Sequence, residues 1–144
     1  MKKALCTMLL ALVWAPMAQA APHRLAPGVW QIQDGLEFAT NGKSDSKREF
    51  CIQPGKTIVT PDWFAELAKP KDDCQARLSL ESDQEMMFDI ACVSNGLPLA
   101  GPSHIRFTDN AFSIDSDLEM DLGGTPFPMH RALSAKRVKS QCTP

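Results

Sequence analysis

Carboxylates stand at every second position of one stretch of the chain, a pattern that could bind a cation. The residues are Asp115, Asp117, Glu119 and Asp121. An EF-hand loop also needs a glycine at its sixth position and a distant bidentate glutamate, and this stretch has neither. On an extended strand these side chains share one face about 7 Å apart. We therefore predict a solvated outer strand face that resists edge pairing, and no metal site.

The other residue types that perform catalysis show no motif. His23, His104 and His130 lack the H-E-x-x-H and H-x-H spacings of metal sites. The serine hydrolase motif G-x-S-x-G is absent, and no pair of carboxylates is singled out for glycoside hydrolysis. The sequence therefore predicts no catalytic residues and no cofactor, and a small hydrolase is the least favoured class.

The amino-terminal segment has the pattern of a secretory signal peptide. Lys2 and Lys3 precede an apolar run from Ala4 to Trp14, and Ala18-Gln19-Ala20 forms a small-x-small cleavage site. We expect cleavage near Ala20, leaving residues 21–144 as a single domain in the periplasm or secreted. The apolar run is shorter than the roughly 20 residues of a spanning helix, so we expect no stable membrane anchor.

Charge and cysteine content describe the expected exported domain further. The net charge falls from −2 to about −4 when Lys2 and Lys3 are removed, which argues against nucleic acid as a partner. An even number of cysteines in an exported chain predicts two disulfides. A four-thiolate zinc site is the alternative, but no C-x-x-C pair is present. The cysteines are Cys51, Cys74, Cys92 and Cys142.

The stretch from Cys74 to Cys92 predicts a β-hairpin. Apolar residues alternate with polar ones on both sides of Ser82-Asp83-Gln84, which is typical of half-buried strands. A turn centred on Asp83 places Leu78 opposite Phe88, Leu80 opposite Met86 and Cys74 opposite Cys92. This register slightly favours Cys74–Cys92 with Cys51–Cys142. Cys51–Cys74 with Cys92–Cys142 is the alternative, because a register inferred from one turn can slip.

Five further strands are predicted, together with one helix. Trp30 is expected in the core, Asp34-Gly35 at a bulge or kink, and Phe50 inward with Cys51 outward. Thr60-Pro61 is typical of a helix start, and Pro70 is expected to end that helix. We read residues 43–47 as a continuation of the Asn41-Gly42 turn and residues 97–99 as a loop. The strands are expected over 29–40, 48–53, 103–108, 112–122 and 127–138.

These elements predict a mainly β fold. We expect an antiparallel meander of about seven strands forming a curved sheet or small barrel, with one short helix between strands two and three; a sandwich is the alternative. Trp63 and Phe64 on the helix, with Leu97 and Leu99 in the loop, are the candidate binding residues at a barrel mouth. For the aromatic pair, plugging the open end of the sheet is the favoured alternative.

Several landmarks together resemble one protein family. They are Pro27-Gly28-Val29-Trp30, the run Phe50-Cys51-Ile52-Gln53-Pro54, single cysteines at the start of one strand and the end of the next, and a cysteine near the carboxyl end. This order resembles the proteobacterial domain-of-unknown-function family 3617. Members carry a glycine before the final cysteine, whereas this chain has Ser140-Gln141-Cys142. The resemblance implies export to the periplasm and four cysteines, and it transfers no catalytic residue.

The sequence therefore favours a monomeric, non-catalytic binding protein whose ligand is an apolar small molecule or an envelope protein. An inhibitor or partner protein of an envelope enzyme is the alternative. An enclosed apolar cavity would favour the first function and a protruding rigid loop the second, whereas a cleft with convergent acids would favour a hydrolase.

Overall fold

The computed structural model describes residues 23–40, 42–68 and 73–142. The expected signal peptide with its cleavage site, Asn41 of the first turn and the helix stop at Pro70 lie outside these residues.

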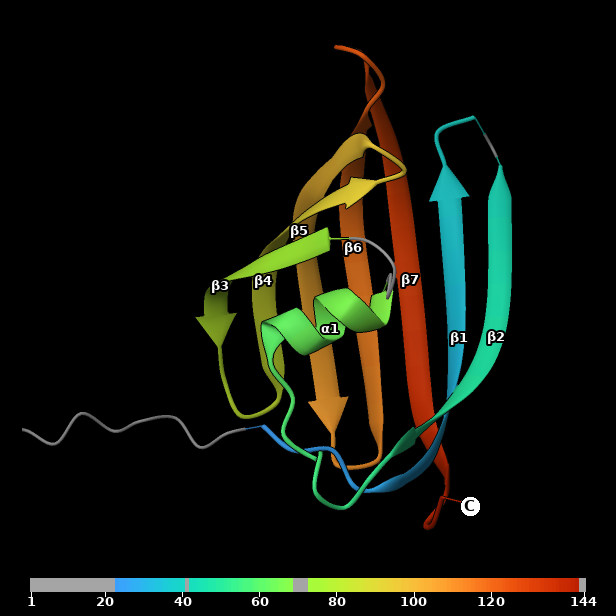
Figure 1. The fold of residues 1–144 in the computed structure, drawn as a ribbon, viewed down its shortest axis with the longest axis vertical. Coiled ribbons are helices and arrows are strands. Elements are labelled where there is room, and N and C mark those ends of the chain that lie inside the picture. Colours follow the sequence, from blue (N-terminus) through green and yellow to red (C-terminus); the bar gives the residue numbers. More distant parts are fainter. Residues whose placement is uncertain (1–22, 41, 69–72, 143–144) are drawn as a thin grey trace, which may run out of the picture.

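Seven antiparallel strands form one sheet in the order β2-β1-β7-β6-β5-β4-β3. Because β1 pairs with β7, the β1–β2 hairpin extends the meander beyond its last strand, and β2 and β3 remain as edges. The predicted mainly β meander with one helix after the second strand is confirmed; the sheet is curved and is not closed into a barrel (Figure 1). The strands are β1 (Gly28–Phe38), β2 (Lys43–Ile52), β3 (Asp73–Glu81), β4 (Glu85–Ser94), β5 (Leu97–Thr108), β6 (Ala111–Asp121) and β7 (Pro126–Lys139).

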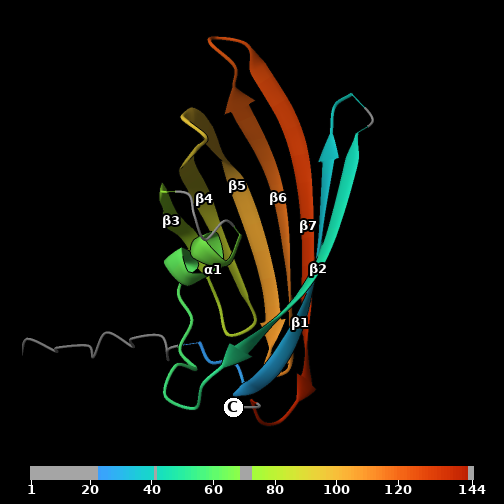
Figure 2. The ribbon, with the colours of Figure 1, turned by 45° about the vertical axis from the view of Figure 1, so that its right-hand side comes forward.

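The helix α1 (Pro61–Ala68) lies against the concave face of the sheet (Figure 2). Its start is the one the sequence predicts, because the amide of Trp63 donates to Thr60 Oγ1 at 3.2 Å, the bond of an N-cap residue. Asp62 in the first turn accepts the amide of Ala76 at 3.2 Å. This bond fastens the helix to edge strand β3 and covers one of its backbone donors.

Aromatic rings fill the space between α1 and the sheet. Trp30 and Phe64 have no exposed surface, and Phe64 packs against Phe112 with ring centroids 5.3 Å apart. Trp30 also lies 5.7 Å from Phe112, and its indole nitrogen donates to the carbonyl of Ala26 at 3.0 Å. The predicted core position of Trp30 is confirmed, and its one polar atom is satisfied.

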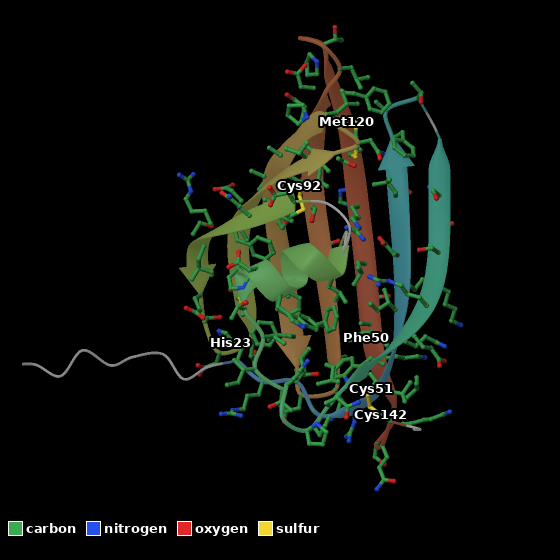
Figure 3. The ribbon with its side chains drawn as sticks, in the orientation of Figure 1. His23, Phe50, Cys51, Cys92, Met120 and Cys142 are labelled. Carbon is green, nitrogen blue, oxygen red and sulfur yellow. A yellow bond between two sulfur atoms is a disulfide. The ribbon has the colours of Figure 1, made fainter. Side chains whose placement is uncertain are left out.

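Two disulfides join the cysteines in the predicted preferred pairing. Cys51 on β2 is bonded to Cys142 beyond β7, and Cys74 is bonded to Cys92 across the β3–β4 hairpin. Figure 3 shows Cys51 and Cys142 at the end of the sheet where β2 finishes and Cys92 nearer the other end. The first disulfide therefore ties an edge of the sheet to the end of the chain, and the second closes a local hairpin.

The hairpin register is only partly as predicted. Leu78 opposes Phe88 and Cys74 opposes Cys92, but a bulge between Leu78 and Leu80 places Leu80 opposite Met87 and not opposite Met86. The extra residue turns Leu80 toward the outer face. Leu78 and Leu80 are 42% and 43% exposed because β3 is an edge strand.

Three predicted boundaries or irregularities are wrong. β2 begins at Lys43, because an edge strand exposed on both faces needs no apolar alternation. β5 begins at Leu97 and runs through Gly101, where a Cβ would lie 2.1 Å from the carbonyl oxygen of Asp117; the glycine permits this close approach to β6. Gly35 pairs regularly with Asp45, so β1 has no bulge there, and its irregularity lies at Val29/Trp30.

Candidate functional site

The concave face has two parts. We call the part under α1 the helix-covered half, defined by Trp30, Phe50, Phe64, Phe107 and Phe112. The part beyond it is the open half, which holds a cavity of about 150 Å³. The cavity is lined by Asp34, Leu36, Ser44, Ser46, Ile90, Cys92, Leu99, Leu118, Met129 and Arg131.

The curvature of the sheet creates this cavity. Residues of β2 and of β4 line it together, although four strands separate β2 from β4 in the sheet order. The strands of the two sides therefore curl toward each other. Where they approach, β2 presents only Ser44 and Ser46, and side chains this small leave the space between the two sides unfilled.

The wall of the cavity is mainly apolar. Ile90, Leu99, Leu118 and Met129 come from four consecutive strands of the sheet and are each less than a tenth exposed. They point inward because they occupy the buried parity of their strands, as the alternating burial of β4, β6 and β7 shows. The wall can therefore accept an apolar group without rearrangement of the fold.

A buried ion pair forms the polar end of the cavity. Arg131 on β7 binds Asp34 on β1 through both its Nε and Nη2 atoms, with a distance of 2.7 Å from Nε to Oδ1. The side chains are 9% and 18% exposed. A bidentate pair of this kind fixes both groups and cancels their charges. The cavity therefore presents a polar but neutral end next to an apolar wall.

The structure brings one of the four predicted binding residues to this cavity. Leu99 lines it, whereas Leu97 is half-buried at the start of β5 and does not contribute to the lining. Phe64 is fully buried in the core, and Trp63 packs against Phe50 with ring centroids 6.1 Å apart. The aromatic pair thus plugs the helix-covered half, the alternative interpretation favoured from the sequence.

Sequence reasoning missed the ion pair, although a signal was present. Asp34 falls on the same parity as Trp30, Ile32 and Leu36 in its strand. Arg131 falls between Met129 and Leu133, both buried. A charged residue on the inward parity of a strand is rarely buried without a partner, so the pattern signals that each of the two needs a partner, and only the pairing of β1 with β7 shows which one.

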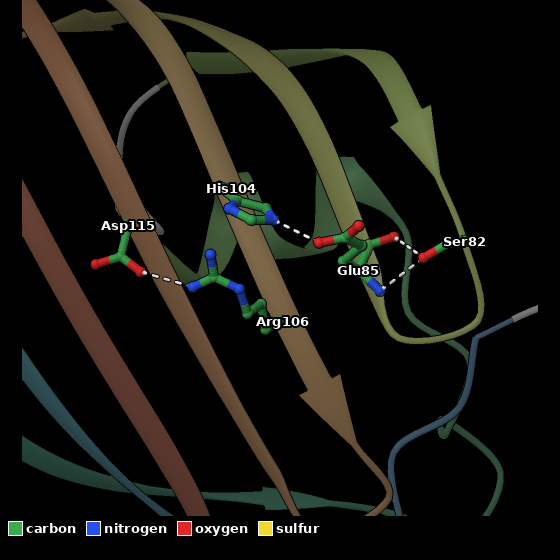
Figure 4. Close-up of polar contacts among 5 residues, drawn as sticks. All are labelled: Ser82, Glu85, His104, Arg106 and Asp115. Atoms are coloured by element: carbon green, nitrogen blue, oxygen red, sulfur yellow. Dashed lines mark hydrogen bonds and ion pairs between the residues drawn. The ribbon is translucent and has the colours of Figure 1, made fainter.

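The polar contacts on the outer face do not form a catalytic triad. His104 Nε2 lies 2.9 Å from Glu85 Oε2, while Ser82 contacts only backbone atoms of Glu85 (Figure 4). In a triad one histidine nitrogen contacts the carboxylate and the other contacts the nucleophile, whereas the side-chain hydroxyl of Ser82 bonds to Glu85 and not to His104. Arg106 pairs loosely with Asp115 beside them, at 3.9 Å. These contacts link neighbouring strands across the outer face.

The remaining histidines also contact carboxylates. His23 lies 2.8 Å from Glu81, and His130 lies 2.8 Å from Asp117 of the acidic row. Among residues 23–40, 42–68 and 73–142, no group of three or more His, Cys, Asp or Glu is arranged to hold a metal ion. Nor does this part of the chain contain a helix long and apolar enough to cross a membrane.

No family model, curated protein or solved structure matches the chain. The resemblance to family 3617 stays a prediction, and the functional argument rests on the geometry of the cavity.

Proposed function

We propose that the protein is a non-catalytic binding protein that holds the apolar end of a small, uncharged amphiphile in the cavity of the open half. The observation that carries this proposal is the cavity itself, which joins four buried apolar side chains to a charge-neutral Arg131–Asp34 pair. Pockets that combine an apolar wall with few polar groups are typical of small-molecule sites.

The size of the cavity limits the part of the ligand that enters it. At about 150 Å³ the cavity is smaller than the roughly 300 to 1,000 Å³ of drug-sized pockets. It is comparable to an apolar cavity of about 150 Å³ that binds benzene. The bound group is therefore a small ring or a short aliphatic chain, and the head group that it carries lies at the Arg131–Asp34 end of the cavity.

The polar end favours an uncharged head group. Asp34 already neutralises Arg131, so an anionic head group would have to compete with a bidentate carboxylate. A cation would face the same competition for Asp34. The hydroxyls of Ser44 and Ser46 on the β2 side can donate to or accept from a ligand hydroxyl or amide.

The proposed place of action is the periplasm or the extracellular medium. The signal-like amino terminus, the resemblance to family 3617 and the two disulfides support this location. The ligand is held and released unchanged in this proposal, and the protein serves as its carrier or sensor.

Calorimetric titration with 1-octanol and with octanoate tests the proposal. We expect 1-octanol to bind in the cavity and octanoate to bind at least roughly tenfold more weakly, because its carboxylate competes with Asp34. Leu118→Phe narrows the cavity and should abolish octanol binding. Leu122→Phe, at a position 45% exposed and outside the cavity lining, is the matched control and should bind normally.

Two results would overturn the proposal. One is the absence of octanol binding by the unaltered protein. The other is equal binding by the Leu118→Phe and Leu122→Phe variants, which would place the ligand elsewhere. Native mass spectrometry of protein purified from periplasm, without refolding, complements the titration: an adduct released on denaturation, and missing from Leu118→Phe, identifies the natural ligand.

A further inference from the structure

The outer edge of β2 is an open strand edge. Among the described strands, β2 pairs through its backbone with β1 alone. The other edge strand, β3, is protected, because Asp62 of α1 takes the amide of Ala76 and a bulge interrupts the strand between Leu78 and Leu80. No such protection covers β2 from Lys43 to Glu49 in the described part of the chain.

The hydrogen-bond alternation of the β1–β2 pair shows which residues face this edge. The amide of Phe38 donates to the carbonyl of Gly42 at 2.8 Å, which makes Phe38 and Gly42 a hydrogen-bonded pair. Bonded and non-bonded pairs alternate along an antiparallel ladder. Ser44, Ser46 and Arg48 therefore direct their backbone groups toward β1. The residues whose backbone groups point outward are Lys43, Asp45, Lys47 and Glu49.

The charges of these four outward-facing residues alternate in sign. Read along the strand they are positive, negative, positive and negative, and all four side chains are exposed. An antiparallel second copy centred on Ser46 places Lys43 opposite Glu49 and Asp45 opposite Lys47. Two-fold symmetry repeats each contact, so four pairs of opposite charge face one another.

Neighbouring registers lack this complementarity. A register centred on Asp45 places Asp45 opposite Asp45 of the second copy and Lys43 opposite Lys47. A register centred on Lys47 places Lys47 opposite Lys47 of the second copy and Asp45 opposite Glu49. Like charges directly opposite each other are destabilising. Registers centred on Ser44 or Arg48 give two pairs of opposite charge and the register centred on Ser46 gives four, so the charge pattern favours the register centred on Ser46.

We propose that β2 pairs with β2 of a second copy of this chain, antiparallel and centred on Ser46, to form a two-fold dimer with one continuous sheet. The dimer replaces the monomer that the sequence alone favours. Lys43 also contacts Glu37 on β1, and Lys43 holds the pKa of that carboxyl below its ordinary value. An ammonium group has three donors, so Lys43 can bind Glu37 on one side and Glu49 of the second copy on the other.

The dimer would place the two ligand cavities next to each other. Its formation does not require the proposed ligand. Ser44 and Ser46 line the cavity and lie on the inner face of β2. At the two-fold axis Ser46 lies opposite Ser46 of the second copy. Because both side chains are small, they form only a low wall between the two cavities.

Engineered cysteines test the register. In the proposed ladder Ser46 opposes itself in a non-hydrogen-bonded pair, for which Cα atoms lie about 4.5 Å apart, within the range that disulfides span. Ser46→Cys should therefore yield a covalent dimer under oxidising conditions. Ser44→Cys is the matched control and should not, because Ser44 opposes Arg48. Crosslinking of both variants, or of neither, would overturn the register.

Charge reversal tests the dimer itself by analytical ultracentrifugation of the chain from residue 21. The double variant Asp45→Lys/Glu49→Lys has an all-positive strand, and Lys43→Glu/Lys47→Glu has an all-negative strand. Each should be monomeric alone, and their mixture should form a heterodimer. Lys136→Glu/Lys139→Glu on interior strand β7 is the control for net charge and should dimerise like the unaltered protein. A monomeric unaltered protein at about 100 μM, or no association on mixing, would overturn the proposal.

Discussion

The two halves of the concave face are built from the same strands and filled in different ways. β1 contributes Trp30 and Ile32 to the helix-covered half and Asp34 and Leu36 to the open half. β6 likewise contributes Phe112 to the first and Leu118 to the second. Along β1 and β6 the inward side chains become smaller or polar beyond the helix, so one continuous sheet face holds both the aromatic cluster and the cavity.

Because of this difference, we expect the helix-covered half to determine the stability of the fold and the open half to determine ligand binding. The rings under α1 pack against one another, and loss of one leaves a void that the others cannot fill. The open half already contains a void, bounded by side chains whose removal enlarges it. We therefore expect substitutions in the helix-covered half to act on folding and substitutions in the open half to act on the ligand.

The largest contrast concerns the two disulfides. Cys51–Cys142 closes a sequence separation of 91 residues, and Cys74–Cys92, at the border of the cavity, closes 18. By the loop-entropy model, replacing Cys51 and Cys142 with alanine should lower the free energy of unfolding by about 4 to 5 kcal/mol. Replacing Cys74 and Cys92 with alanine should lower it by about 3 kcal/mol. Urea unfolding of the two double variants measures both values. Equal costs would show that loop length does not dominate.

Trp30→Ala tests the helix-covered half directly. Trp30 is completely buried and packs on Phe50 and Phe112, so we expect a loss of about 3 to 5 kcal/mol in the free energy of unfolding. Leu36→Ala, at a half-buried residue of the same strand in the open half, is the comparison and should cost less. An unchanged midpoint of thermal unfolding for Trp30→Ala would refute the core role.

The sequence predicts the strands, the helix start and the preferred disulfide pairing well, because alternation, caps and turns are local signals. Thr60-Pro61 predicts the start of α1, and the hairpin register predicts the Cys74–Cys92 bond. The Leu80 register fails because a bulge inserts one residue, and nothing in the local pattern marks Ser79 as the extra one. Local patterns thus predict the elements better than the exact pairing between them.

The open half was not predicted because it depends on contacts between distant strands. Asp34 and Arg131 are 97 residues apart, and β1 lies next to β7 only because the first hairpin joins the far side of the meander. β2 has no apolar alternation before Arg48, so its first half reads as a loop. Curvature then creates a cavity that no single strand encodes. Of the four candidate binding residues, Leu99 alone lines this cavity.

Substitutions in the Arg131–Asp34 ion pair of the open half should change the free energy of unfolding less than Trp30→Ala does. Arg131→Met leaves the carboxylate of Asp34 buried without its bidentate partner, and we expect a loss of about 2 to 3 kcal/mol. The double variant Asp34→Leu/Arg131→Met removes both charges and should recover most of that loss. Urea unfolding of the single and double variants completes the cycle. A double variant less stable than Arg131→Met would contradict the neutralising role.

The smallest predicted loss of stability comes from removing the N-cap of α1. It also tests whether a change in the helix-covered half alters binding in the open half. Thr60→Ala removes the oxygen that accepts the Trp63 amide and should cost about 1 kcal/mol, whereas Thr60→Ser keeps the oxygen and should be nearly neutral. Because Trp63 and Phe64 do not line the cavity, octanol affinity should be the same for both variants. A weaker affinity for Thr60→Ala alone would mean that the helix shapes the cavity, and that folding and binding are coupled through the sheet they share.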